Sequence, residues 1–277
     1  MRKLLIAFDL DGTLLPRVDF IEERTISAVR RARKLGHIPV ICTARPFSMF
    51  RWIYEAMELD TPVCTINGAI VYNPTDPDFP RYESLIPREI VDKILLATTS
   101  LGAFLPLYIE CGDTIYHSPG NHSSYYRERI KTSPCPIELG TDYPSIPASR
   151  IIISPSDIES ARRMAEYVAS LDGVKEASWD FLPGTSSPGG LRMSIALNGV
   201  DKWNAVEKIA SYYGIPTEDI YAFGDMWNDF EMLRRAGHGY ALKGSDAEQN
   251  SGAKFVTRCT CEECGVADII EKEILKR

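Results

Sequence analysis

The sequence predicts an α/β fold in which helices cover both faces of a doubly wound parallel sheet. The first observation is residues 4–8, a continuous apolar run that is typical of a strand buried on both faces. The second is that such runs alternate with helical patterns in the first 75 residues and again in the last third. The third is a middle stretch without this alternation. We therefore predict a core from residues 1–82 and 196–277, with an α+β unit inserted at residues 83–195.

The first third of the chain carries three strand signals separated by two helix signals. Apolar residues recur at helical spacing from Ile26 to Leu35, and Gly36 supplies a helix stop. Pro46 suits the first turn of a second helix, which is predicted over residues 47–59. The predicted strands are residues 4–8, 38–42 and 62–66.

The final third repeats the alternation, and the middle mixes strands, helices and loops rich in Pro, Ser and Gly. The final third is predicted to hold helices at residues 201–213, 228–236 and 267–275 and strands at residues 220–223, 239–242 and 255–257. The middle is predicted to hold strands at residues 104–110, 150–154 and 191–197, helices at residues 88–99 and 157–170, and loops at residues 132–147 and 183–190.

Composition excludes several classes of protein. With 44% hydrophobic and 25% charged residues, the 277-residue chain has ample material for a globular core. Its net charge of −7, without a basic cluster, argues against nucleic acid as a partner. The apolar run near the N-terminus is too short for a signal peptide, and no stretch approaches a membrane span of roughly 20 residues. We expect a cytoplasmic protein without a membrane partner. Seven unevenly spread cysteines do not imply a disulfide framework.

Two acidic residues directly follow the first predicted strand, in the segment Asp9-Leu10-Asp11-Gly12-Thr13. Side chains two residues apart in extended backbone point the same way, so Asp9 and Asp11 are predicted to face one site. The carboxyl ends of strands are where open parallel sheets bind ligands, and Gly12 permits a tight turn there. The alternative interpretation is a polar turn between strand and loop.

Polar residues also follow other predicted strands or open a helix. Thr43 follows residues 38–42, where its hydroxyl and nearby amides are placed to bind a phosphate oxygen. Asn67 follows residues 62–66, and Lys202 opens the helix after the inserted unit. Taken alone, these residues are also explained by a helix N-cap, a simple turn and an exposed surface lysine.

Two further carboxylates, Asp225 and Asp229, follow the predicted strand at residues 220–223. They are also explained by helix capping and the helix dipole. However, four carboxylates gathered at one sheet edge repel one another, and a hard divalent cation relieves this repulsion. Mg²⁺ prefers carboxylates, water and phosphate oxygens, so the cluster is interpreted as a magnesium and phosphate site.

Together these motifs resemble the haloacid dehalogenase superfamily, in the phosphatase branch with a large α/β cap that is called Cof-type. The resemblance covers essentially the whole chain, and the inserted unit falls where that branch carries its cap. It implies a Rossmann-like core, Mg²⁺ as cofactor, and hydrolysis of a small phosphorylated metabolite, with sugar phosphates as the substrate class. The motifs occur in family order: Asp9-x-Asp11-Gly12-Thr13, Thr43, Lys202 and Gly224-Asp225-x-x-Asn228-Asp229.

The resemblance also implies roles for these residues. Asp9 would be the nucleophile that forms an aspartyl-phosphate, and Asp11 the general acid and base. The metal would be held by the Asp9 carboxylate, the Asp11 backbone carbonyl and Asp225, with support from Asp229. The other matching positions would hold phosphoryl oxygens or lie near substrate: Thr43, Lys202, Gly12, Arg45, Asn67 and Asn228.

Some features depart from the family pattern or lie outside it. Ala44 stands where the family commonly has Gly, and Trp203 stands where Gly often follows the lysine. Trp203 is expected either to narrow the substrate entrance or to pack beneath the cap, and we favour packing. Cys259, Cys261 and Cys264 have spacing that can bind zinc, but a structural zinc site usually needs four ligands. We therefore favour a loop that happens to use cysteine.

Three other functions remain as alternatives at this point. A phosphomutase would use the same scaffold and the same aspartyl-phosphate. A non-catalytic module that binds sugar phosphates would not need Asp9 and Asp11 together. A zinc-dependent interaction protein would rest on the cysteines alone.

Overall fold

The chain divides into two compact units. The computed structural model describes residues 2–17, 19–102, 104–119, 127, 130–131, 136–138, 145–181 and 191–276. The core unit comprises Met1–Arg45, Phe50–Tyr82 and Asp201–Arg277, and the inserted unit comprises Pro46–Met49 and Glu83–Val200. The predicted boundary at residue 195 falls inside a strand of the inserted unit, whereas the structural division follows that strand at Val200.

The core unit is built on an eight-stranded sheet with the order β14-β13-β12-β1-β2-β3-β4-β5. Parallel pairing joins β14 through β3, and β4 pairs antiparallel with β3. The chain leaves β1 towards β2 on one side, and β12 later returns on the other, so β1 lies at a topological switch point. The strands are β1 (Leu5–Phe8), β2 (Ile38–Cys42), β3 (Val63–Thr65), β4 (Ile70–Tyr72), β5 (Tyr82–Glu83), β12 (Ile220–Gly224), β13 (His238–Ala241) and β14 (Phe255–Val256).

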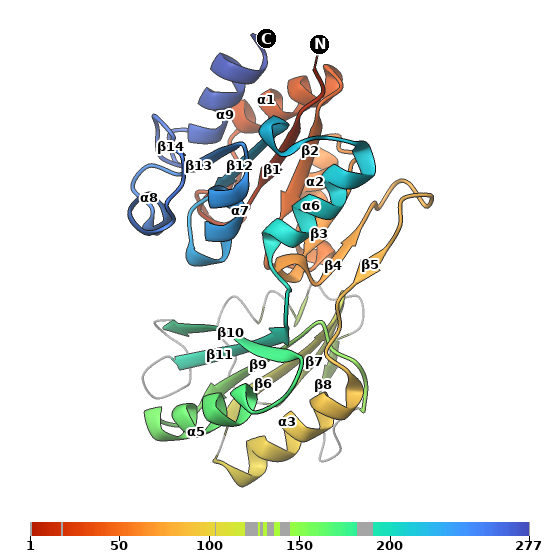
Figure 1. Cartoon of the computed structure of the whole chain (residues 1–277), viewed down its shortest axis with the longest axis vertical. Coiled ribbons are helices and arrows are strands. Elements are labelled where there is room, and N and C mark those ends of the chain that lie inside the picture. Colours follow the sequence, from red (N-terminus) through yellow and green to blue (C-terminus); the bar gives the residue numbers. More distant parts are fainter. Residues whose placement is uncertain are drawn as a thin grey trace. The chain divides into compact units, whose positions relative to one another are not determined.

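Helices cover both faces of this sheet, as Figure 1 shows for α1 and α9 on one face and α6 and α7 on the other. The four residues of β1 are all buried, which matches the apolar run in the sequence. The helical elements are α1 (Glu23–Lys34), α2 (Arg51–Ala56), α6 (Lys202–Tyr213), α7 (Phe230–Arg235), α8 (Asp246–Asn250) and α9 (Gly265–Ile269), with short turns η2 (Ile66–Gly68), η3 (Thr217–Asp219), η4 (Trp227–Asp229) and η5 (Ile270–Ile274). The predicted doubly wound α/β core is confirmed.

Several predicted helices are shorter or less regular than expected. The helix predicted at residues 47–59 is divided into the 3-10 turn η1 (Phe47–Met49) and α2, because the backbone at Phe50 is not helical. The helix predicted at residues 228–236 begins as the 3-10 turn η4 before α7, and the closing helix ends in the π-helical turn η5. In contrast, α6 begins and ends as predicted, with Asp201 as N-cap and Gly214 in the left-handed conformation.

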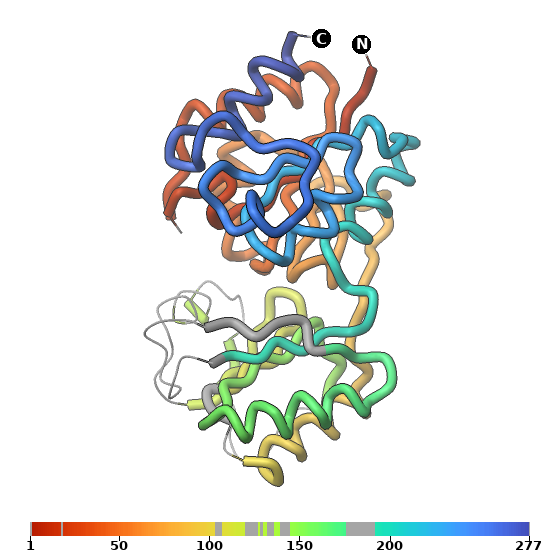
Figure 2. Tube along the Cα trace, turned by 60° about the vertical axis from the view of Figure 1, so that its left-hand side comes forward, coloured from red at the N-terminus to blue at the C-terminus, as the bar shows by residue number. Residues whose placement is uncertain are grey.

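The inserted unit contains a six-stranded sheet with the order β10-β11-β9-β6-β7-β8. All its neighbouring strands are antiparallel except β7 and β8, so the predicted α+β character is confirmed. Figure 2 shows α3 and α5 on the same face of this sheet. The elements are α3 (Arg88–Ser100), β6 (Phe104–Cys111), β7 (Thr114–His117), β8 (Pro136–Glu138), β9 (Arg150–Pro155), α5 (Ile158–Ala169), β10 (Val174–Phe181) and β11 (Leu191–Leu197).

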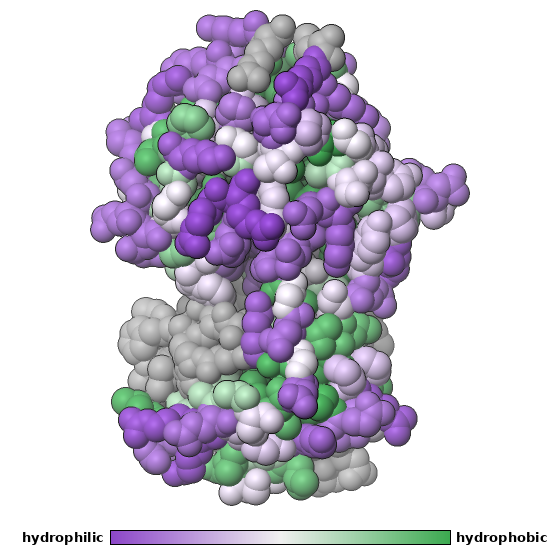
Figure 3. Space-filling model, in the orientation of Figure 1, coloured by the Kyte–Doolittle hydropathy of each residue, from purple (hydrophilic) through white to green (hydrophobic). Residues whose placement is uncertain are grey.

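The loop predicted at residues 183–190 lies outside the described residues, as does most of the loop predicted at residues 132–147, in which only β8 and the end near Pro147 are described. Hydrophilic residues predominate on the face of the core unit shown in Figure 3. Within the described part of the chain, no helix is long and apolar enough to cross a membrane.

Candidate active site

The first acidic motif lies at the carboxyl end of β1, between β2 and β12. The amide of Asp9 donates to the carbonyl of Phe223 at 3.0 Å, which continues the pairing of β1 with β12, and its side chain is buried. The carbonyl of Leu10 accepts from the amides of Thr13, Leu14 and Leu15 at 2.8–3.2 Å. This tight loop carries Asp11 away from the sheet, where its side chain is 42% exposed.

Glycine is required at two positions, Gly12 and Gly224, where the loop after β1 meets the loop after β12. Gly12 has a φ of +78°, and a β-carbon there would lie 2.2 Å from Oδ2 of Asp225. Gly224 likewise faces Asp229, whose Cγ would lie 2.4 Å from an added β-carbon. Thr13 donates its hydroxyl to Oδ1 of Asp225 at 3.0 Å. The sequence predicted a turn at Gly12 but did not assign Thr13 to the site.

Three of the four predicted carboxylates come together. Asp9, Asp225 and Asp229 each offer one oxygen such that these atoms lie within 4.8 Å of one another. Among the described residues, this is the only group of three or more acidic, histidine or cysteine side chains with that spacing. The carboxylate of Asp11 is not in the group, and both of its oxygens contact Arg45.

Lys202 is the cation of this cluster. Its Nζ donates to Oδ1 of Asp9 at 2.5 Å and to Oδ1 of Asp229 at 2.7 Å. Its side chain is completely buried, so the interpretation as an exposed surface lysine is wrong. Burial alone would lower the pKa of Lys202, but Asp229 and Asp9 raise it well above its ordinary value. Lys202 is therefore an ammonium ion at neutral pH.

Asp229 holds the last motif together. Its Oδ1 accepts from Lys202, and its Oδ2 accepts from the amides of Asp225 and Met226 at 3.0 and 3.2 Å. The four-residue spacing between Asp225 and Asp229 brings the carboxylate of Asp229 next to the backbone amides that follow β12. Because both of its oxygens receive protein hydrogen bonds, Asp229 is suited to orient Lys202 and Asp225.

The cluster carries an excess of negative charge. Three carboxylates face one ammonium, which leaves a buried formal charge of −2 when all are ionised. Burial raises the pKa of Asp9 well above its usual range, although Lys202 opposes the shift. Burial, followed by repulsion from Asp229, raises the pKa of Asp225 to about 7. A divalent cation would neutralise this charge, and the hard oxygen donors of Asp9 and Asp225 fit Mg²⁺.

The second motif lies beside the first, at the ends of β2 and β3. Thr43 is fully buried, its amide donates to Cys64, and its Oγ1 accepts from the amide of Arg45 at 3.2 Å. Helix α2 begins only at Arg51, so the interpretation of Thr43 as a plain N-cap is wrong. The guanidinium of Arg45 binds both carboxylate oxygens of Asp11, with Nε 2.8 Å from Oδ2.

Asn67 and Asn228 are brought together from distant parts of the chain. Nδ2 of Asn228 donates to Oδ1 of Asn67 at 3.1 Å. Asn67 has a φ of 55° and its amide donates to the carbonyl of Thr43 at 2.9 Å. Ile66 also has a positive φ, which is uncommon for a β-branched residue and indicates local strain beside the site.

The cysteine-rich loop is near the first motif, but it does not form a ligand set. Sγ of Cys261 donates to the carbonyl of Thr13 at 3.2 Å, and burial raises the pKa of this thiol to about 12. Cys259, Cys261 and Cys264 are all described, and they are not among the grouped metal-binding side chains found in that part of the chain.

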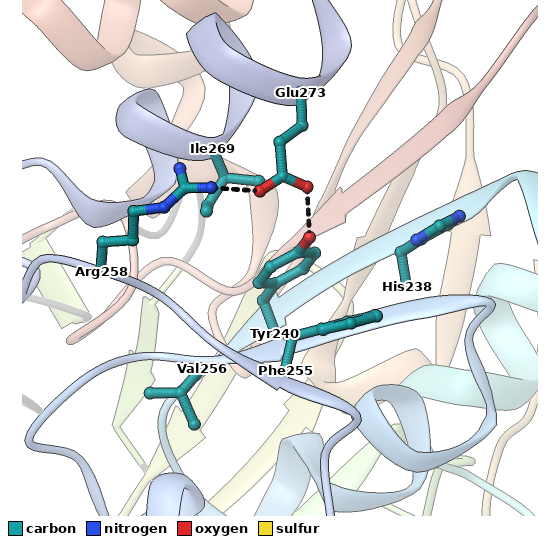
Figure 4. A pocket seen from close by; sticks show the side chains of 7 residues that line it. All are labelled: His238, Tyr240, Phe255, Val256, Arg258, Ile269 and Glu273. Atoms are coloured by element: carbon teal, nitrogen blue, oxygen red, sulfur yellow. Dashed lines mark hydrogen bonds and ion pairs between the residues drawn. The ribbon is translucent and has the colours of Figure 1, made fainter.

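A separate pocket of about 340 Å³ lies against β13, β14 and α9 (Figure 4). The hydroxyl of Tyr240 donates to Glu273 at 2.5 Å, and Arg258 donates to the same carboxylate at 2.9 Å. No residue of the acidic cluster lines this pocket. The pocket is therefore separate from the candidate active site, which lies at the carboxyl end of β1. The lining residues are His238, Tyr240, Phe255, Val256, Arg258, Ile269 and Glu273.

Comparison with known proteins gives consistent results. A family model described as haloacid dehalogenase-like hydrolase matches residues 6–270. The 5-amino-6-(5-phospho-D-ribitylamino)uracil phosphatase YitU of Bacillus subtilis is 31% identical over 273 residues, which cover 97% of this chain and 96% of the relative. The pyridoxal phosphate phosphatase YbhA of Escherichia coli is 25% identical, with 92% and 93% coverage. The crystal structure of a haloacid dehalogenase-like hydrolase from Bacteroides thetaiotaomicron matches with a TM-score of 0.79 at 21% identity, with 98% and 99% coverage, and supports the same fold.

Proposed function

The chain belongs to the haloacid dehalogenase-like hydrolases as a Cof-type phosphatase, and from this premise we propose that it hydrolyses sugar phosphates through an aspartyl-phosphate on Asp9 with Mg²⁺ as cofactor. The observation that carries the proposal is the contact of Asp9 with Lys202 at 2.5 Å, inside a cluster with two further carboxylates. This arrangement orients a nucleophile and leaves a negative charge that suits a divalent cation.

The proposed reaction has two steps. In the first, a carboxylate oxygen of Asp9 attacks phosphorus, the bond from phosphorus to the ester oxygen breaks, and the leaving oxygen takes a proton from Asp11. In the second, water attacks phosphorus while Asp11 takes its proton, and the bond to Asp9 breaks to release phosphate. Asp9 and Asp11 both return to their initial states, so the protons balance over the cycle.

The other site residues bind and orient the phosphoryl group. Lys202 restrains Asp9 and adds positive charge beside the phosphoryl oxygens, and Thr43 offers a buried hydroxyl at the next strand end. Asp9 and Asp225 would hold Mg²⁺, with a further contact from the main chain of Asp11. When bound, the metal would neutralise charge on the phosphoryl group and the carboxylates.

The proposed substrate class rests on chemistry and on the relatives. A site that supplies one nucleophile, one acid–base group and a phosphoryl clamp acts on monoesters and does not itself select the alcohol. The substrate named for YitU carries its phosphate on a ribityl chain, a sugar alcohol, and the substrate named for YbhA is pyridoxal phosphate. We therefore place sugar and sugar-alcohol phosphates first among the candidates.

The central experiment is the variant Asp9→Asn, assayed with p-nitrophenyl phosphate and Mg²⁺. We expect phosphate release to fall at least about 10³-fold while the fold is retained, because Asn has the same shape but is not a nucleophile. Chelation by EDTA should stop turnover of the wild-type protein, and Mg²⁺ should restore it. Retained activity in the variant would refute the assigned nucleophile, and indifference to EDTA would refute the metal.

The substrate class is tested with a panel of phosphate monoesters ranked by kcat/KM. We expect sugar or sugar-alcohol phosphates to rank above nucleoside monophosphates and pyridoxal phosphate. Each product is analysed for free phosphate and for an isomerised sugar phosphate, since an isomerised product would indicate a phosphomutase.

A further inference from the structure

We propose that Arg45 is a positioning residue that aims the carboxylate of Asp11 and does not itself bind substrate. The inference rests on the proposed function, because it assumes that Asp11 is the acid and base of the reaction. It differs from the expectation based on family resemblance, which placed Arg45 near substrate or phosphate.

The contact between the two side chains is bidentate. Nε of Arg45 lies 2.8 Å from Oδ2 of Asp11, and Nη2 contacts Oδ1. Arg45 is 2% exposed, whereas the side chain of Asp11 is 42% exposed. A buried guanidinium therefore holds the inner side of a carboxylate whose other side faces solvent. The planar fork of arginine fixes the orientation of a carboxylate, which a lysine cannot do.

The backbone of Arg45 is held independently of Asp11. Its amide donates to Oγ1 of Thr43 at 3.2 Å, and its carbonyl accepts from the amide of Ile66 at 3.2 Å. The next amide, of Asn67, donates to the carbonyl of Thr43 at 2.9 Å. These hydrogen bonds join the turn after β2 to the strained turn after β3. The backbone that carries the guanidinium of Arg45 is therefore fixed by hydrogen bonds.

The backbone of Asp11 is also held, and only its side-chain torsions remain to be fixed. The amide of Gly12 donates to the carbonyl of Leu15 at 3.0 Å, and Asp11 itself forms a bridge with Leu15. An aspartate with an exposed carboxylate would otherwise sample several orientations. Arg45 selects one of them, and small misplacements of a catalytic group are costly.

This arrangement suits the two tasks of Asp11. Each carboxylate oxygen has a second lone-pair site beside the one that faces Arg45. Such a site can carry the proton that goes to the leaving oxygen and later take one from water. In the alternative, Arg45 binds the phosphoryl group through guanidinium N–H groups other than the two that contact Asp11. The two cases predict different responses to the leaving group.

The experiment compares phenyl phosphate with 2,4-dinitrophenyl phosphate in single-turnover mixing with excess enzyme and Mg²⁺. Phenolate needs a proton to leave, whereas dinitrophenolate leaves without one. Arg45→Lys keeps the charge but loses the fork. We expect release of phenol to slow at least about tenfold and release of dinitrophenolate less than about threefold. Asp11→Asn should give the same pattern, and the double variant should add no further loss.

Arg33→Lys is the matched control, because Arg33 forms a similar bidentate pair with Asp60 at 2.8 and 2.6 Å away from the acidic cluster. It should leave both rates unchanged. Equal losses with the two substrates, a higher enzyme concentration needed for half-saturation of the single-turnover rate, or additive losses in the double variant would overturn the positioning role. If the wild-type protein releases neither leaving group, the proposed function fails instead.

Discussion

Gly12 lies so close to Asp225 that a β-carbon at Gly12 would stand 2.2 Å from Oδ2 of that carboxylate. Gly12→Ala is therefore expected to displace Asp225 and to strain a backbone with a φ of +78°. We predict that it lowers kcat at least about 100-fold and the free energy of unfolding by about 3 kcal/mol. Steady-state kinetics and urea denaturation measure the two effects.

The variant Gly36→Ala is a control that tests backbone strain alone, without a steric clash between the added β-carbon and a neighbouring side chain. Gly36 has a similar φ of +87°, but an added β-carbon there meets nothing within 4 Å. It should cost about 1 kcal/mol and leave kcat unchanged. If both variants lose the same free energy of unfolding and keep the wild-type kcat, the close approach of Gly12 to Asp225 does not contribute to catalysis.

Lys202 is predicted to be essential for stability as well as for catalysis. Lys202→Met removes the ammonium that contacts Asp9 at 2.5 Å and Asp229 at 2.7 Å, and it leaves these buried carboxylates unpaired. We expect a loss of about 3–5 kcal/mol in the free energy of unfolding without metal. Adding Asp229→Asn should recover part of the loss, because one buried charge is removed.

The comparison for this variant is Lys208→Met, at a partly buried lysine of the same helix that lies over the ring of Tyr82. It should change stability by no more than about 0.5–1 kcal/mol. A metal-free Lys202→Met protein as stable as the Lys208→Met protein would contradict the assigned charge balance.

The convergence of the acidic residues could be predicted because it follows from backbone geometry. A continuous buried run ends at Asp9, and parallel strands bring their carboxyl ends to one edge, so Asp225 arrives beside it from the distant strand β12. Trp203 is packed, as we favoured, because it is 2% exposed and lies in the hydrophobic cluster of the core unit. The roles assigned to these residues stay predictions.

Side-chain pairing was harder to predict. The pairing of Arg45 with Asp11 depends on the turn after β2 and on the strained backbone at Ile66. The spacing of residues in the sequence reveals neither of these features. The strand β10 was not predicted, because it mixes polar and apolar residues and has an irregular register between Glu176 and Ser178. The strands β4, β5, β7 and β8 were also missed, since two to four residues give too short a pattern.

Magnesium binding is predicted to weaken in acid. The pKa of Asp225 is raised from 3.8 to about 7, so protonation of Asp225 stabilises the metal-free fold fully below about pH 4, and this stabilisation is lost as the pH rises through 7. Mg²⁺ must displace that proton. We expect its apparent affinity to fall at least about tenfold per pH unit below about pH 7, because Asp225 must lose a proton and the pKa of Asp9 is also raised.

Calorimetric titration of the metal-free protein with Mg²⁺ between about pH 5.5 and pH 7.5 measures this dependence. Asp225→Asn should bind Mg²⁺ weakly at every pH and lose the part of the pH dependence that Asp225 contributes. An affinity that stays constant over this range in the wild-type protein would be incompatible with a protonated carboxyl at the metal site.

The thiol of Cys261 donates to the carbonyl of Thr13 at 3.2 Å. Since Thr13 in turn donates to Asp225, Cys261→Ala should loosen the loop, lowering the free energy of unfolding by about 1 kcal/mol and kcat severalfold. Cys261→Ser keeps a donor and should lose less, and Cys259→Ala is the control. Equal effects of Cys261→Ala and Cys259→Ala would exclude this role. Stoichiometric zinc in the purified protein, lost in Cys261→Ala, would instead identify the loop as a metal site.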